Sequence, residues 1–246
     1  MNEFSLLNEE LIIKESDNPM EHVKKHFNDE ATIYDINIKN LIPYYNQMVE
    51  AIISSIPYEK TKRIKVIDFG CGTGTISKAV KMKYPDAEIT CVDIAENMLE
   101  VAKDKLKEYD DINYVLADFQ SFELDKKYDL VVSSLALHHL TTDKCKQNLY
   151  LKCYENLNQN GYFFNADVVL ASSDMLQQVY MDKWIEYMKR NVSEEEVQNT
   201  WLPTYYNEDC PAKLADHIKW LAEIGFKDVD VIWKYYNFAV YCGRKQ

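Results

Sequence analysis

The stretch VIDFGCGTGTISKAV, residues 66–80, joins an apolar run to an acid and three alternating glycines. The chain has only six glycines in 246 residues, yet Gly70, Gly72 and Gly74 fall within five positions. Because glycine loses more conformational entropy on folding than other residues, such a cluster indicates a backbone that turns sharply or approaches a ligand closely. The sequence therefore predicts a binding loop directly after a buried strand.

Short β-branched runs alternate with helical patterns around this loop, which is typical of an α/β fold with a mostly parallel sheet. Strands are predicted at 63–69, 87–94, 112–118, 128–137 and 161–169, and helices at 75–85, 96–109, 143–157 and 210–226. The signal Asn160-Gly161 is predicted to stop the third of these helices, and Gly225 to lie near the end of the fourth. Two final strands with almost no turn residues between them predict an antiparallel hairpin at the edge of the sheet.

Two segments fall outside this pattern. Residues 1–60 predict an N-terminal helical cap, and residues 61–246 the main domain. Within that domain, an insert at 172–210 that is rich in Met, Trp and Tyr predicts a helical lid packed on the core. Trp201, Tyr205 and Tyr206 in this insert are candidate walls of an apolar substrate pocket.

Composition and charge narrow the range of partners. A net charge of −12 opposes binding to nucleic acid or anionic lipid, so the expected partner is a small molecule. No apolar run is long enough to cross a bilayer, and no basic leader begins the chain. The six cysteines are scattered without zinc-site spacing, which predicts reduced thiols, no metal and a cytoplasmic protein. Residues 1–60 either close over the ligand or bind a second copy of the chain in a homodimer.

The register of the glycines separates two classes of ligand. A dinucleotide-binding loop has the spacing G-x-G-x-x-G/A, and neither Gly70 nor Gly72 begins such a run, because the sixth positions are Thr75 and Ser77. A carboxylate at Asp68 also has the wrong charge to face a pyrophosphate. It suits a cationic ligand that carries an ammonium or a sulfonium group.

The segment DFGCGTG resembles the glycine loop of the class I S-adenosylmethionine-dependent methyltransferases, through Asp68 and the three glycines. The resemblance implies a Rossmann-like seven-stranded fold and S-adenosylmethionine as the cofactor. It also places Asp93, at the end of the second strand, on the ribose hydroxyls. Cys71 in the loop, and Ile94 and Met98 after the second strand, are further candidates for contact with the cofactor. Asp93 and Glu96 also stand at capping-box spacing, so helix capping is an alternative role for this acid.

Later strands extend the resemblance. Asp118 matches the position that accepts a hydrogen bond from the adenine amino group, with Phe119 beside the base, although Asp118 can also serve as an ordinary turn acid. In VVSSLALHHL, Ser134 and Leu135 match the lining of the sulfonium region, and His139 matches a frequent histidine.

The N-terminal region carries a narrower resemblance. LIPYYNQM is similar to a P-x-Y segment of enzymes related to the carboxy-S-adenosylmethionine synthases, which implies that Tyr45 touches the cofactor. Those synthases also use an arginine after the fifth strand. The only arginine in that region here is Arg190, within the insert, so the carboxylated cofactor is not carried over.

The predicted function is S-adenosylmethionine-dependent methyl transfer to a small molecule. Candidate bases for a hydroxyl or amine acceptor are His139, Asp167 and Tyr34, while His139 also has a plain structural role as an alternative. A nicotinamide-dependent oxidoreductase and an S-adenosylmethionine-binding regulator without turnover are the two competing functions.

Overall fold

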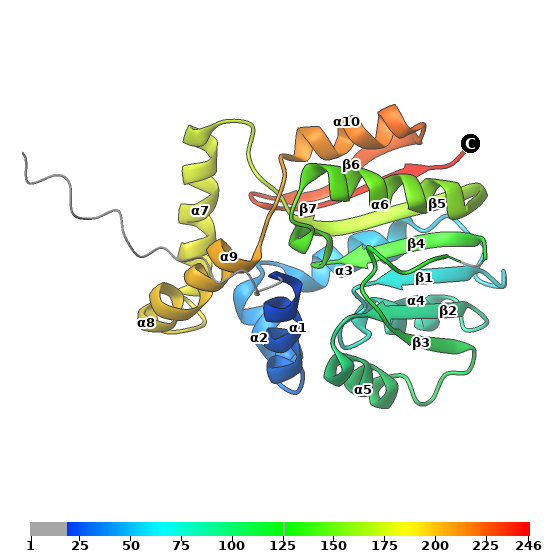
Figure 1. The fold of residues 1–246 in the computed structure, drawn as a ribbon, viewed down its shortest axis with the longest axis horizontal. Helices are drawn as coiled ribbons and strands as arrows, with labels where there is room; N and C mark the ends of the chain where they lie inside the picture. The colour runs from blue at the N-terminus through cyan, green and yellow to red at the C-terminus, as the bar shows by residue number, and fades with distance from the viewer. Residues whose placement is uncertain (1–18, 125) are drawn as a thin grey trace, which may run out of the picture.

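A seven-stranded sheet forms the centre of the computed structural model, which describes residues 19–124 and 126–246 (Figure 1). Its strands are β1 (Lys65–Phe69), β2 (Glu88–Asp93), β3 (Ile112–Leu116), β4 (Tyr128–Ser134), β5 (Leu157–Val168), β6 (Lys227–Tyr235) and β7 (Phe238–Arg244). The order across the sheet is β3-β2-β1-β4-β5-β7-β6. The first five strands are parallel, while β7 runs antiparallel to both β5 and β6. The predicted Rossmann-like fold with a terminal hairpin is confirmed.

Helices flank the sheet and extend beyond it. They are α1 (Pro19–Glu30), α2 (Tyr34–Leu41), α3 (Tyr45–Ser55), α4 (Thr75–Lys83), α5 (Glu96–Lys105), α6 (Asp143–Asn156), α7 (Asp174–Met188), α8 (Glu194–Glu196), α9 (Leu202–Glu208) and α10 (Leu214–Ile224). A short 3₁₀ helix η1 (Leu137–His139) follows β4, and a π-helical segment η2 (Val197–Trp201) precedes α9. No helix within residues 19–124 and 126–246 is long and apolar enough to cross a membrane.

The inner strands β1, β2, β4, β5 and β7 are largely buried on both faces, whereas the outer strands β3 and β6 are not. Val66 of β1 packs in a cluster with Met48 of α3, and the next residue, Ile67, packs in a second cluster with Leu149 of α6 and Leu221 of α10. The two clusters form one hydrophobic core on each face of the sheet. This layering leaves the strand ends as the open edge where a ligand can bind.

The insert packs on the core and meets the N-terminal helices. Met181, Trp184 and Met188 of α7 are buried in the same cluster as the α3 face of the sheet. The Trp184 indole N–H donates to the carbonyl of Leu41 (2.8 Å), which ties α7 to the end of α2. In Figure 1, α1 and α2 lie between the sheet and the group formed by α7, α8 and α9.

One local prediction is wrong. The pair Asn160-Gly161 does not stop α6, because that helix ends at Asn156 and β5 already begins at Leu157. Asn160 has a positive φ of 61° inside β5, next to an irregularity in the β4–β5 register. An Asn-Gly pair supports a left-handed backbone equally well at a helix end and at a bulge, so the pair marks a bulge here.

The glycine loop leaves β1 at the carboxyl edge of the sheet in a left-handed conformation. Gly70, Gly72 and Gly74 have φ values of 64°, 52° and 79°. The Gly70 amide donates to the carbonyl of Val92 (2.8 Å), so the loop is fastened to the neighbouring strand β2. A Cβ on Gly70 would lie 2.2 Å from Cβ of Ala136, whereas a Cβ on Gly72 meets no atom within 4 Å.

This difference predicts the effects of two alanine substitutions on stability. Gly70→Ala combines a steric clash with left-handed strain and lowers the free energy of unfolding by about 3 kcal/mol or more. Gly72→Ala carries the strain without the clash and costs about 1 kcal/mol. Urea unfolding of both variants measures the two values, and equal losses would contradict the packing argument.

Candidate functional site

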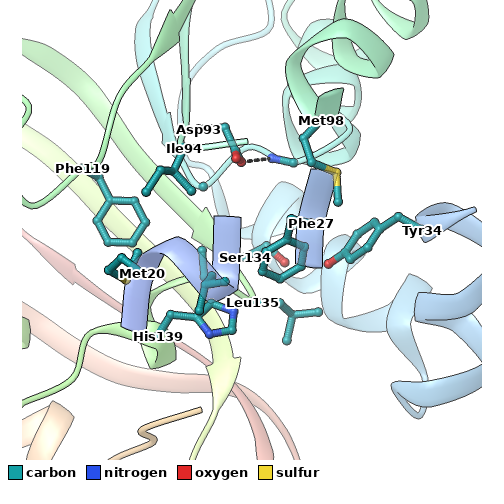
Figure 2. A pocket seen from close by; sticks show the side chains of 14 residues that line it. Met20, Phe27, Tyr34, Asp93, Ile94, Met98, Phe119, Ser134, Leu135 and His139 are labelled. Carbon is teal, nitrogen blue, oxygen red and sulfur yellow. Dashed lines mark hydrogen bonds between the residues drawn. The ribbon is translucent and has the colours of Figure 1, made fainter. Parts of the chain in front are cut away.

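Three adjoining pockets lie at the carboxyl ends of the strands, where α1 and α2 cover them. The inner cleft, shown in Figure 2, is lined by Met20, Val23, Phe27, Tyr34, Gly70, Gly72, Asp93, Ile94, Met98, Phe119, Ser134, Leu135, Ala136 and His139. The loop recess is lined by Tyr34, Tyr45, Asp68, Gly70, Cys71, Gly72, Thr73, Thr75, Ile76 and Ser134. The outer cavity is lined by His26, Phe27, Glu30, Tyr34, Asn37, Ile38, Leu41, Ile42, Leu135, His138, His139, Val168, Trp184, Trp201, Thr204, Tyr205, Glu208 and Asp209.

Asp93 is the polar centre of the inner cleft. One carboxylate oxygen accepts from the Gly72 amide (2.7 Å) and the other from the Ala95 amide (2.9 Å). Ala95 is the N-cap residue of α5 and makes no side-chain cap hydrogen bond, so the predicted alternative of a capping box between Asp93 and Glu96 is wrong. Burial raises the pKa of Asp93. A carboxylate oxygen has further lone pairs, so these two bonds leave acceptor capacity for a ligand in the cleft.

Apolar side chains flank Asp93. Ile94 and Phe119 lie on one side of Asp93 in Figure 2 and form an apolar slot that suits a flat ring, while Met98 lies on the other side. Asp118 stands beside this slot but does not line it. One of its carboxylate oxygens accepts from the Gln120 amide (2.8 Å), as expected of a turn acid.

Asp68 defines the loop recess. It is 1% exposed, and one oxygen accepts from the Ser77 hydroxyl (2.7 Å) while Oδ1 has no hydrogen-bond partner. Burial raises its pKa to about 7. Tyr45 lines the same recess, and burial raises the pKa of its hydroxyl to about 12, so it remains protonated. An unpaired buried carboxylate oxygen is costly and indicates a site for a donor or a cation.

Asp35 of α2 fastens the N-terminal helices to the glycine loop. Its carboxylate accepts from the Thr73 hydroxyl (2.6 Å) and pairs with the Lys105 ammonium of α5 (2.5 Å). Lys105 also donates to the Thr73 hydroxyl (2.7 Å). Residues from three separate elements thus close one side of the loop recess.

The end of β4 forms the junction between the pockets. Leu135 has a positive φ of 54°, which is strained for a branched side chain, and it lines both the inner cleft and the outer cavity. Ser134 lines the inner cleft and the loop recess, and its buried hydroxyl has no partner. Tyr34 lines all three pockets.

His139 lies at the same junction and is buried. Its Nδ1 lies 3.2 Å from the carbonyl of Glu208, whereas Nε2 has no partner. Because a carbonyl can only accept, Nδ1 carries the proton and Nε2 presents a lone pair. Burial, together with the charge on His138, lowers the pKa of His139 to about 4, so the ring is neutral.

His138 has the opposite charge state. Its Nδ1 bonds to Asp167 (2.5 Å) and its Nε2 lies 3.5 Å from Asp209. Burial alone would lower the pKa of His138, but these two carboxylates raise it to about 10. Asp167 also accepts a hydrogen bond from the side chain of Asn165 (3.1 Å). It lies behind His138, and it is not among the described residues that line the three pockets.

The structure brings most of the predicted site residues together. The predicted cofactor contacts lie in the inner cleft or the loop recess, except Gly74 and Asp118. Gly74 instead faces α5, where a Cβ would lie 2.9 Å from Leu106. Of the candidate bases, His139 and Tyr34 reach the junction. Of the predicted lid walls, Trp201 and Tyr205 line the outer cavity, whereas Tyr206 is 68% exposed.

Sequence reasoning missed residues that come from distant segments. Met20, Val23 and Phe27 of α1 cover the inner cleft, and Glu30, Glu208 and Asp209 line the outer cavity. These residues carry no local motif, so only the tertiary structure shows their role. The first part of the predicted helical cap, residues 1–18, lies outside the described residues.

Comparisons with known proteins agree with this geometry. Residues 66–161 match a family described as a methyltransferase domain. The chain is 28% identical to the carboxy-S-adenosyl-L-methionine synthase of Campylobacter hominis, over 91% of this chain and 96% of that protein. It is also 33% identical to the malonyl-[acyl-carrier protein] O-methyltransferase of Acetivibrio thermocellus, over 46% of this chain and 38% of that protein.

Solved structures show the same fold. A complex of DhpI with SAM and HEP superposes with a TM-score of 0.64 at 18% identity, covering 94% of this chain and 99% of that one. Phosphoethanolamine N-methyltransferase 2 of Haemonchus contortus, in complex with S-adenosyl-L-methionine, has a TM-score of 0.64 at 15% identity. It covers 89% of this chain and 60% of that one.

The glycine loop and these comparisons support a class I S-adenosylmethionine-dependent methyltransferase. Residues 66–161 form the matched methyltransferase domain, and the two solved structures named above hold S-adenosylmethionine.

The raised pKa of Asp68 predicts how the stability of the ligand-free protein depends on pH. The unfolded carboxyl ionises near 3.8 and the folded one near 7, so the folded state holds a proton that the unfolded state has lost. Stability therefore falls as the pH rises through this window. Between about pH 5 and about pH 7.5, the wild-type protein should lose about 2 kcal/mol more than Asp68→Asn.

Urea unfolding of both proteins at the two pH values measures this difference. Other titrating groups are shared and cancel in the comparison. Parallel pH dependence in the two proteins would show that Asp68 ionises normally.

Proposed function

We propose that the inner cleft and the loop recess hold S-adenosylmethionine, and that the outer cavity holds a small-molecule methyl acceptor. The observation that carries the proposal is the junction of these pockets at Tyr34, Leu135 and His139. A methyl donor and its acceptor must meet at one point while their remaining atoms occupy separate spaces. Two pockets that share one wall provide that arrangement.

The residues fit the cofactor. Asp68 Oδ1 is a buried acceptor without a partner and suits the ammonium of the methionine part. The open space at Gly72 admits a ligand next to the backbone, and Asp93 can accept from the ribose hydroxyls. The apolar slot at Ile94 and Phe119 suits the adenine ring.

The bound cofactor supplies a methyl group activated by a positively charged sulfur. The protein's own contribution is to align the acceptor and exclude water. Phe27 and Leu135 form apolar walls at the junction, and Phe27 packs edge-on against His139 with ring centroids 5.4 Å apart. The free lone pair on His139 Nε2 can take the proton of a hydroxyl or amine acceptor. Asp167 then acts as a positioning residue, because it holds His138 beside His139.

The site favours the unmodified cofactor over a carboxylated one. A carboxylate on the transferred carbon needs a nearby cation, and an arginine is the usual partner. The chain has three arginines, and they pair with Asp111, Glu186 and Asp228. No lysine or arginine among the described residues lines the three pockets. The similarity to carboxy-S-adenosyl-L-methionine synthases therefore supports the fold and the cofactor site rather than the same product.

The competing functions have less support. The register of the glycines does not fit a dinucleotide, and the outer cavity gives an acceptor a place that a regulator without turnover does not need. An acidic chain with a small cavity favours a small molecule over nucleic acid. A cytoplasmic location and a homodimer stay predictions from the sequence.

Calorimetric titration with S-adenosylmethionine, S-adenosylhomocysteine and NADH tests the cofactor. Both adenosyl ligands should bind and NADH should not. Asp93→Ala removes the acceptor and loosens Gly72, so adenosyl affinity should fall by about 100-fold or more. The exposed Asp110→Ala is the matched control and should bind like the wild-type protein. Binding of NADH alone would overturn the proposal.

The role of His139 predicts a separation of turnover from cofactor binding. His139→Gln keeps a polar side chain of similar reach but removes the basic nitrogen. For an acceptor that must lose a proton, kcat should fall by about 100-fold or more while the affinity for S-adenosylmethionine changes little. Formation of S-adenosylhomocysteine and calorimetry measure the two quantities. An unchanged kcat would assign His139 a purely structural role.

A further inference from the structure

Aromatic rings form the walls of the outer cavity. Phe27, Tyr34, Trp184, Trp201 and Tyr205 come from α1, α2, α7, η2 and α9, and all line it. The rings of Trp184 and Tyr205 meet edge to face with centroids 5.1 Å apart. Aromatic faces carry negative electrostatic potential and attract organic cations. The cavity therefore has the lining of a cation-binding site.

The charged side chains around the cavity are mainly negative, like the electrostatic potential of the aromatic ring faces. Glu30, Glu208 and Asp209 line it, whereas no lysine or arginine of the described chain does. Its two protonatable partners are already engaged, because His26 pairs with Glu208 (3.2 Å) and His138 with Asp167 and Asp209. Acidic groups remain in excess.

Glu30 is the carboxylate of the cavity wall that pairs with neither histidine. Its Oε2 accepts from the Asn37 side-chain amide (2.8 Å), which is a neutral partner. Both residues line the outer cavity, one from the end of α1 and one from α2. A cation in the cavity would complete the charge balance of Glu30.

From these features we infer that the acceptor is a small organic amine that carries positive charge, and that its nitrogen is the atom methylated. The inference rests on the proposed function and names its substrate class. An anionic acceptor would face three carboxylates without a lysine or arginine. A neutral acceptor would leave Glu30 without a charged partner.

A second feature of the cavity indicates which other groups the amine carries. Trp201 lines the cavity, and its indole N–H is buried without a partner. An indole N–H can only donate, so the acceptor should carry an oxygen that accepts from it. The volume of the cavity is about 120 Å³, which accommodates a ligand of a few carbon atoms around these groups. A short amino alcohol satisfies both requirements.

The chemistry balances without a further reactant. The ammonium of the acceptor first loses one proton to solvent by way of Nε2 of His139, which frees the nitrogen lone pair. His139 does not keep the proton, because its pKa is lowered to about 4. The nitrogen then forms a bond to the methyl carbon as the carbon–sulfur bond breaks, and sulfur keeps the bonding pair. The products are a methylated ammonium and S-adenosylhomocysteine, and the proton leaves to solvent.

Three probes of nearly equal shape test the charge preference on protein saturated with S-adenosylhomocysteine. Choline is the cation, 3,3-dimethylbutan-1-ol its neutral isostere, and 3,3-dimethylbutanoate an anion. Calorimetry and the fluorescence of Trp184 and Trp201 report binding. Choline should bind about tenfold tighter than the alcohol, and the anion weakest. N,N-dimethylethanolamine should then yield choline on turnover with S-adenosylmethionine.

A pair of variants on α1 locates the preference. Glu30→Gln should weaken choline binding about fivefold or more and leave the alcohol unchanged. Glu21→Gln on the same helix, whose side chain is 66% exposed, is the matched control and should change neither.

Two outcomes distinguish a failure of the amine assignment from a failure of the proposed methyltransferase function. Normal binding of S-adenosylhomocysteine with no preference for choline, or with no binding of choline, would overturn the amine assignment and leave the methyltransferase site intact. Failure of S-adenosylhomocysteine to bind would overturn the proposed function, and the substrate class with it.

Discussion

The carboxylate of Asp93 is the constraint on which the site depends. It holds the Gly72 amide of the loop and the Ala95 amide at the start of α5, while the carbonyl of Val92 accepts from Gly70 and Cys71. Together these bonds fix a left-handed backbone against the ends of β1 and β2. The inner cleft and the loop recess share this backbone as a wall. An acid of normal solvent exposure would not be held so firmly, because water would compete for the same amides.

Two neighbouring histidines at the junction have different charge states: His138 is protonated and His139 is neutral. His138 is fixed in its protonated form by the carboxylates of Asp167 and Asp209, and its charge helps to keep His139 neutral. Behind them, Asn165 donates to Asp167 and to the Tyr241 hydroxyl, which meets the Tyr150 hydroxyl (2.8 Å). This buried hydrogen-bonded chain fixes the positions of both rings. A base that is neutral before the acceptor arrives needs no prior loss of a proton.

The sequence predicted the parts of the molecule that depend on short-range order. The strand alternation and the register of Gly70, Gly72 and Gly74 were sufficient for the fold and for one wall of the site. Asn160-Gly161 was misread because a left-handed pair fits a helix end and a bulge alike. The outer cavity was only partly foreseen, since Glu30 and Asp209 are far apart in the chain and belong to no motif. Burial also changes what a residue does: the charge states of His138 and His139 depend on tertiary neighbours.

The inner cleft and the loop recess are formed by different parts of the chain from those that form the outer cavity. The matched methyltransferase domain covers residues 66–161 and supplies most of the lining of the inner cleft and the loop recess. The walls of the outer cavity come mainly from α1 and α2 before it and from α7, η2 and α9 after it. Substitutions in those outer segments can alter the acceptor while the glycine loop and its acids stay unchanged. Proteins with this fold can thus change which molecules the outer cavity admits by varying the segments on either side of the matched domain, while the inner cleft stays the same.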